Sequence, residues 1–257
     1  MPKIEFDVPY PRPEKLSDPY HDFSAQELRN LLLASDDARR WPHFQSILNG
    51  ILPAGTYEES VFFLPMALDY MRREPYETFD CIEDVVRWTA EHFERLREDG
   101  ISDATRAGIR TCFEAWTAQF KVEHYNEVRW NRMRWSPSLR DIVVPTVSVV
   151  DLITNLSRHE CLADLAEACV DSLANRYDSP VRSAWMLEFA HGMREVLRIL
   201  GELCELRSDH IRAVIFDQAL LQRHVDRIAD TLMAWEPSPT YWPNLLATLG
   251  LRRPQRN

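Results

Sequence analysis

The amino-acid sequence predicts an all-α protein, an antiparallel multi-helix bundle of about ten helices that follows an extended, Pro-rich N-terminal arm. Only seven of the 257 residues are glycine, and the apolar/polar alternation that is typical of a half-buried strand is nearly absent. Apolar residues recur instead at the three- and four-residue spacing of helices that bury one face. Helix-start signals, in which Ser or Thr is followed three residues later by Glu, precede several of these segments.

The first 23 residues carry five prolines, which remove backbone donors and exclude a helix. We therefore expect residues 1–23 to form an extended arm. The arm either packs along the surface or waits for a partner, and packing is favoured because it would bury the apolar side chains of Ile4, Phe6, Val8, Tyr10 and Tyr20.

Residues 24–250 are expected to form a single all-helical domain, with two lobes dividing near 141–147 as the alternative. Residues 251–257 are expected to be a frayed tail.

Helices of the first half are placed by their start signals. Ser24 with Glu27 and Thr56 with Glu59 form capping boxes, in which each side chain bonds the other residue's backbone N–H. Pro65 is expected to kink or divide the helix that contains it. The helices expected in this half cover 25–34, 37–49, 57–73, 76–98 and 104–135, the last of them ending at Ser136-Pro137.

The second half follows the same logic. A third capping box, Ser157 with Glu160, predicts a helix start, and Ser179-Pro180 and Ser238-Pro239 each place proline at a first helical position. Gly100 and Gly250 are expected to end helices. The helices expected here cover 147–156, 158–176, 180–204, 208–235 and 239–249.

Composition and charge narrow the classes of function. No tract approaches the roughly 18 apolar residues that span a bilayer, and the N-terminus lacks a signal-peptide pattern, so a cytoplasmic location is expected. The formal net charge of −10 disfavours nucleic acid and an anionic membrane as partners and favours a basic protein. The five cysteines form no CxxC pair and are expected to be reduced and mostly buried.

Catalytic motifs with a defined spacing are missing: the chain contains no HExxH, GxSxG, Walker or GxGxxG sequence. One metal-type spacing occurs, in which Glu188 and His191 share a helix face. A di-iron bundle needs a second such pair and two further carboxylates, and no second ExxH exists. A surface glutamate and a hydrogen-bonded histidine are therefore favoured, and no cofactor is expected.

An acidic segment covers residues 76–99. It presents either a solvated helix face or a docking face for a basic protein, whose complementary charge would speed the encounter. The residues that we assign to partner binding here are Glu77, Asp80, Glu83, Asp84, Glu91, Glu94 and Glu98.

A second candidate surface is the Arg/Trp segment RWNRMRW. Its residues are either the end of a long helix, where the dipole favours cations, or a protein contact, because Arg and Trp often dominate interface energy. Four arginines over 129–140 are too few for a nucleic-acid surface in so acidic a chain. The candidate contact residues are Arg129, Trp130, Arg132, Arg134 and Trp135.

The stretch GTYEESVFFLPMALDYM at 55–71, followed by an acidic amphipathic helix, resembles the all-helical immunity proteins of bacterial polymorphic and type VI toxin systems. The resemblance implies stoichiometric binding of a cognate toxin without turnover. Two alternatives stay open: a metal-dependent helical enzyme that uses Glu188 and His191, and a helical sensor or scaffold whose small ligand lies near Trp116 and Trp185.

Overall fold

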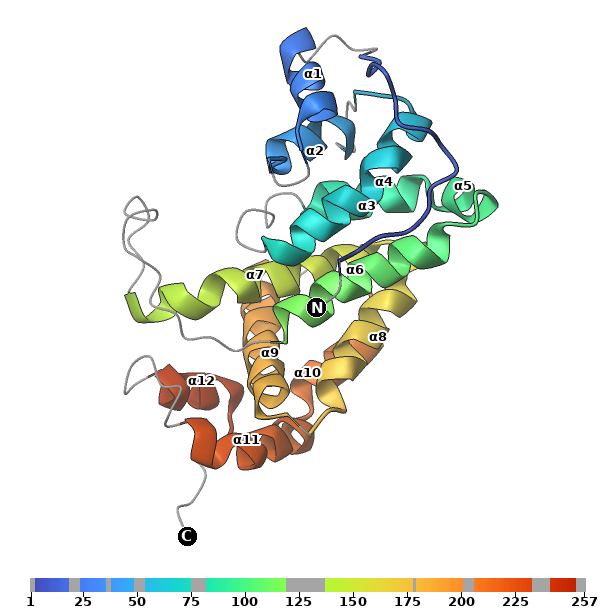
Figure 1. Ribbon diagram of the computed structural model, residues 1–257. Helices are drawn as coiled ribbons and strands as arrows, with labels where there is room; N and C mark the ends of the chain where they lie inside the picture. The colour runs from blue at the N-terminus through green and yellow to red at the C-terminus, as the bar shows by residue number, and fades with distance from the viewer. Residues whose placement is uncertain are drawn as a thin grey trace.

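The computed structural model confirms the all-α prediction (Figure 1). Every regular element in the described part of the chain is a helix, and no strand occurs there. The structure describes residues 3–18, 24–35, 38–48, 54–74, 82–118, 137–177, 179–200, 206–232 and 241–252.

The helices of the N-terminal half occupy the upper part of Figure 1, with the chain before α1 running alongside them. Among them α3 and α6 pack closely against each other, and α1 rests on α2. Their bounds are α1 Ala25–Leu33, α2 Trp41–Leu48, α3 Tyr57–Arg73, α4 Ile82–Glu91, α5 Phe93–Glu98 and α6 Ser102–Trp116.

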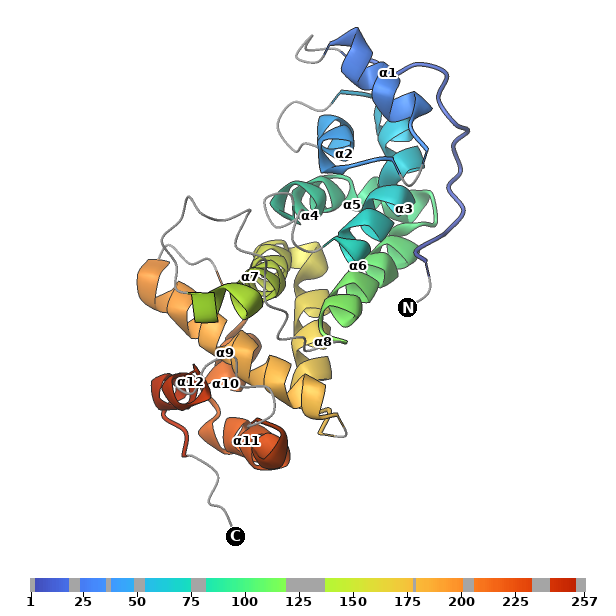
Figure 2. The same ribbon diagram turned by 60° about the vertical axis from the view of Figure 1, so that its left-hand side comes forward.

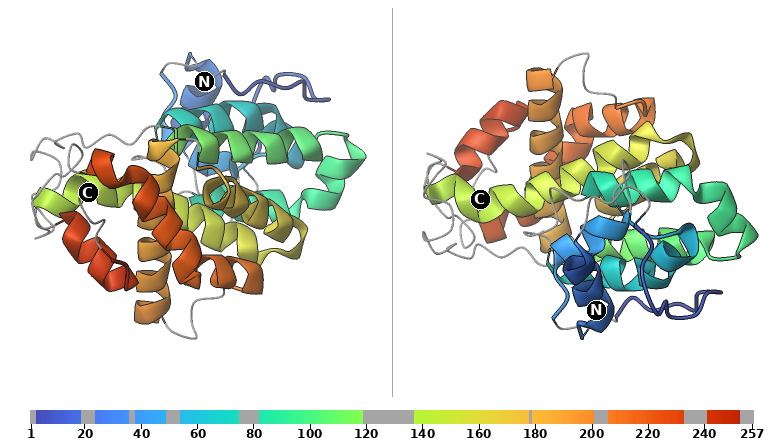
Figure 3. Two further views of the ribbon diagram at one scale, coloured as in Figure 1. Left: turned by 90° about the horizontal axis from the view of Figure 1, so that it is seen from below. Right: turned by 90° about the horizontal axis from the view of Figure 1, so that it is seen from above.

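The C-terminal half is organised around two long helices, α7 and α9. In both views of Figure 3, α9 runs across α7 rather than along it, and α9 also contacts α10, α11 and α12. The bounds are α7 Pro137–Arg158, η2 Glu160–Leu162, α8 Ala163–Ala174, α9 Pro180–Leu200, α10 Asp209–Phe216, α11 Gln218–Leu232 and α12 Tyr241–Leu249.

The two halves share one hydrophobic core, which extends from Ile4 to Leu251. The α4 helix packs against α7, and α6 packs against α7 and α8, so the halves meet along these helices (Figure 2). Residues 141–147, where two lobes could divide, lie inside α7.

A buried polar cluster also joins the halves. Glu114 on α6 accepts a hydrogen bond from the Ser172 hydroxyl on α8 at 2.7 Å and pairs with Arg182 on α9. Burial raises the pKa of Glu114, but the hydrogen bonds with Ser172 and Arg182 outweigh it, so the pKa of this carboxyl lies below its usual value. The carboxylate is therefore charged and holds three helices together.

Two of the three predicted capping boxes are confirmed. Ser24 and Thr56 both form complete capping boxes with Glu27 and Glu59. The α3 helix has the predicted bounds, and Pro65 does not divide it. Gly100 and Gly250 follow helix ends at φ values of 73° and 71°, in the left-handed region that glycine adopts without strain.

Several predicted boundaries are wrong. The helix expected over 76–98 is interrupted at His92, and the one expected over 208–235 is interrupted at Asp217. Asp217 starts a new helix because its carboxylate accepts the Leu220 backbone N–H at 2.9 Å.

The α7 helix also differs from the prediction. It covers Pro137–Arg158, which extends beyond the predicted 147–156 at both ends, and Pro137 occupies its first position, where the missing N–H costs nothing. The residues directly before Pro137 lie outside the described part of the chain. The capping box predicted at Ser157 does not form: α7 continues to Arg158, and the Ser157 hydroxyl donates to the Thr154 carbonyl at 2.8 Å. A short 3-10 turn, η2, then leads into α8.

Three of the five cysteines are described, and none of these three forms a disulfide. Cys112 and Cys169 are buried, and Cys161 is half-buried. Burial raises the pKa of all three thiols, so they are protonated at neutral pH.

Candidate partner-binding surface

The predicted acidic segment folds into α4 and α5. Each of these helices turns an apolar face to the core and a charged face to solvent. On α4 the apolar positions recur at helical spacing and are buried, among them Ile82, Val85 and Trp88. The acidic face is formed by the exposed residues Glu83, Glu91, Glu94 and Glu98 together with the half-buried Asp84. Glu77 and Asp80, which belong to the same prediction, lie outside the described residues.

Part of the charge on the acidic face is paired. Glu83 forms an ion pair with Arg87, and Glu94 forms one with Arg97. Both pairs are at the surface, where such contacts contribute little to stability. Glu91 and Glu98 form no ion pair with any described residue, so they carry the unpaired negative charge of this face.

An open cleft of about 520 Å³ lies beside the acidic face. Ala90, Glu91 and Glu94 form one wall, and residues 158–161, at the turn between α7 and α8, form the other. We call this space the acidic cleft, because Glu160 adds a third carboxylate to it against the single guanidinium of Arg158. The packing of α4 on α7 sets its width.

The other ionisable groups in the cleft are uncharged at neutral pH. Burial lowers the pKa of His159 below its ordinary value, with only Glu91 acting in the opposite direction among the nearby charges. Burial likewise raises the pKa of the Cys161 thiol. A protonated thiol is a poor nucleophile, so the formal charges that line the cleft are those of its three carboxylates and of Arg158.

The alternative metal pair lies elsewhere, on α9. Glu188 is only 2 % exposed, so the expectation of a surface glutamate is wrong. The Nδ1 atom of His191 is buried with no hydrogen-bond partner, and burial lowers the pKa of this imidazole. Within the described residues, no group of three or more His, Cys, Asp and Glu side chains is placed to hold a metal ion.

The Arg/Trp segment is not among the described residues. Arg129, Trp130, Arg132, Arg134 and Trp135 all fall between α6 and α7, in the range 119–136. Their assignment to a protein contact stays a prediction.

Sequence reasoning missed one wall of the cleft. The residues from Arg158 to Glu160 were assigned to a helix start, and the approach of this turn to α4 depends on tertiary packing that no local pattern encodes. The exposed glutamates, by contrast, follow from the periodicity of α4 and α5.

Comparison with protein-family models, with curated proteins and with solved structures finds no match for this chain. In the described part of the chain, no helix combines the length and the hydrophobicity that crossing a bilayer requires.

Proposed function

We propose that this protein acts by binding a basic protein through the acidic face and the acidic cleft, without turnover. One observation carries the proposal: exposed glutamates on α4 and α5 adjoin an open cleft that contains three carboxylates. Complementary charge of this kind steers a basic partner towards the surface and fixes its orientation.

The resemblance of residues 55–71 to bacterial immunity proteins suggests the class of partner, a toxin domain with a basic surface. Figure 1 is compatible with such a role in one respect: α4 and α5 belong to a bundle with a continuous core, so their side chains are presented from packed helices. Presentation from packed elements lowers the entropy cost of association.

Two variants of matched charge test the proposal. The first, Glu91→Lys with Glu98→Lys, reverses the two unpaired charges of the acidic face. The control, Asp209→Lys with Asp226→Lys, makes the same change in net charge at exposed positions on α10 and α11, which Figure 1 places in the opposite half of the molecule.

Each full-length variant is immobilised and exposed to lysate of the source cells, and the proteins that it retains are identified and then titrated by calorimetry. We expect the wild type and the control to retain the same basic protein in a stoichiometric complex. Reversing Glu91 and Glu98 should weaken that complex roughly 10- to 100-fold. Equal affinity for all three proteins, or a retained partner without a basic surface, would contradict the proposal.

A further inference from the structure

Residues 3–18 cross the bundle without forming a helix, which the dark-blue trace of Figure 2 shows. Burial alternates along the first part of this segment, as in an extended chain that lies with one side on a surface. Ile4 is buried, and Phe6, Val8 and Tyr10 are partly buried against the core, whereas Lys3, Glu5, Asp7 and Pro9 are exposed.

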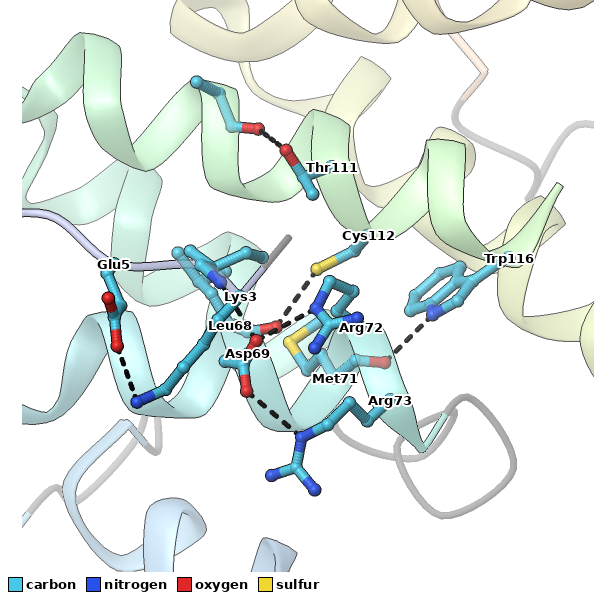
Figure 4. A network of polar contacts seen from close by, with 12 residues as sticks. Lys3, Glu5, Leu68, Asp69, Met71, Arg72, Arg73, Thr111, Cys112 and Trp116 are labelled. Atoms are coloured by element: carbon cyan, nitrogen blue, oxygen red, sulfur yellow. Dashed lines mark hydrogen bonds and ion pairs between the residues drawn. The ribbon is translucent and has the colours of Figure 1, made fainter. Parts of the chain in front are cut away.

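Hydrogen bonds attach this segment at several points. Arg12 donates to the Leu32 carbonyl of α1, and three further attachments involve α3 and the end of α5. Near its start, the Ile4 backbone N–H donates to Asp69 on α3 at 3.0 Å, beside the ion pairs of Asp69 drawn in Figure 4. Near its end, the Ser17 backbone N–H donates to Glu59 on α3 at 3.1 Å. Between them, the Tyr10 hydroxyl donates to Asp99 at 2.9 Å. The outer attachments hold α3, and the middle one holds the residue that follows α5.

The position of α5 depends heavily on this middle attachment. The helix has six residues, and Leu96 is the only one of them that is fully buried. The same Asp99 oxygen that accepts from Tyr10 also accepts the Tyr57 hydroxyl of α3 at 2.8 Å. The guanidinium of Arg95 lies 3.9 Å from the centre of the Tyr57 ring. Polar and stacking contacts near the C-terminal end of α5 therefore supply much of the stabilisation that its small buried surface does not provide.

We infer that the N-terminal segment 3–18 is a strap that holds α5 in place, with Tyr10 as the positioning residue. When the Tyr10 hydroxyl leaves Asp99, this carboxylate loses one of the two tyrosine hydroxyls bonded to it, and α5 remains tied to α3 by the Tyr57 hydroxyl and by the Arg95–Glu58 ion pair. The orientation of Glu94 and Glu98 of the acidic face is then less firmly fixed. The consequence for partner binding rests on the proposed function, whereas the ordering of α5 does not.

Hydrogen exchange of the full-length free protein, followed by mass spectrometry, tests the strap. Tyr10→Phe keeps the ring and removes only the hydroxyl. A hydrogen bond to a charged acceptor contributes enough that its loss should speed exchange in residues 93–101 about tenfold. The reporting amides include those of Leu96, Asp99 and Ile101, which donate to backbone carbonyls of residues 92–96 at 2.9–3.0 Å. Exchange in α9 and α11 should be unchanged.

Two further variants make the test specific. Ser17→Ala removes the side-chain contact at the end of the strap, where the hydroxyl lies 3.3 Å from Glu59, and should leave residues 93–101 at the wild-type rate. In an Asp99→Ala background, Tyr10→Phe should have a much smaller effect on exchange. The inference is overturned if Tyr10→Phe leaves residues 93–101 unchanged, or if it acts equally with Asp99 absent. The exchange experiment uses the free protein, so either result is independent of whether the protein binds a basic partner.

Discussion

Asp69 offers the sharpest test of how the fold is held together, because a buried carboxylate there connects the N-terminal segment to α3. Its side chain is 7 % exposed and accepts hydrogen bonds from the Ile4 backbone N–H at 3.0 Å, from Arg72 at 2.9 Å and from Arg73 at 3.1 Å. Figure 4 shows Arg72 and Arg73 converging on this one side chain.

The loss in free energy of unfolding depends on which hydrogen-bond donors each substitution at Asp69 leaves without an acceptor. Asp69→Ala leaves the Ile4 N–H and the largely buried Arg72 without it, and breaking such a buried pair costs about 3–5 kcal/mol. The contact with the more exposed Arg73 adds less than about 1 kcal/mol, since solvent screens it. Asp69→Asn keeps an acceptor for the Ile4 N–H and should cost about 1–2.5 kcal/mol.

The pH dependence has a defined sign. Burial raises the pKa of Asp69, but its hydrogen bonds with Ile4 and Arg72 outweigh burial, so the pKa is below its ordinary value. A carboxyl of this kind stabilises the fold above its unfolded pKa of about 4, and the contribution is lost as the pH falls below that value. The difference in stability between wild type and Asp69→Asn should therefore shrink between about pH 5 and pH 3.

Urea denaturation followed by circular dichroism, at neutral and at acid pH, measures these free energies of unfolding. If Asp69→Ala costs less than about 1 kcal/mol at neutral pH, or if the Asn variant keeps the same deficit at acid pH, the Asp69 carboxylate does not hold the N-terminal segment on α3.

Two further predictions concern the core. His224 is fully buried, and burial lowers its pKa to about 4. Between about pH 6.5 and pH 4, this histidine is therefore protonated in the unfolded chain but neutral in the folded chain. Stability should fall by up to about 3 kcal/mol from pH 6.5 to pH 4, and His224→Gln should flatten that part of the profile; an unaltered slope would count against it. At Gly108, inside α6, an added Cβ would lie 2.9 Å from the Cδ1 atom of the fully buried Leu68. The overpacking cost of about 1–3 kcal/mol exceeds the roughly 0.5–1 kcal/mol that Ala gains over Gly within a helix, so Gly108→Ala should cost about 1 kcal/mol net. In a Leu68→Ala background most of that cost should disappear, and a cost that persists there would refute the steric explanation.

The sequence predicted several features of the fold that depend on neighbouring residues, although the equally local capping box at Ser157 did not form. A capping box needs only a side chain and a backbone three residues apart, which is why the start of α3 at Tyr57 was found correctly. The break at His92 was not predictable in this way, because the apolar spacing continues through it to Leu96. At this break the His92 ring lies 5.4 Å from the Tyr57 ring of α3, a tertiary contact that no pattern within the segment encodes.

The same distinction applies to the candidate site. The exposure of Glu91 and Glu98 follows from helical periodicity, and the structure places both at the surface. The cleft needs residues 158–161, more than sixty positions later in the chain. A pattern within one helix contains no information about that approach. The buried state of Glu188 was missed for a similar reason, because α9 is covered on several sides by α7, α8, α10, α11 and α12.

The central claim is that unpaired negative charge on α4 and α5 guides a basic protein to this surface. The most direct measurement is the association rate constant of the retained partner, determined by stopped flow across a range of ionic strength for the wild type and for Glu91→Lys with Glu98→Lys. Electrostatic steering predicts a wild-type rate that is raised at least tenfold at low salt and falls steeply as salt is added. The variant should associate slowly with little dependence on salt. A wild-type rate that is independent of salt, or equal rates for the two proteins, would contradict the claim.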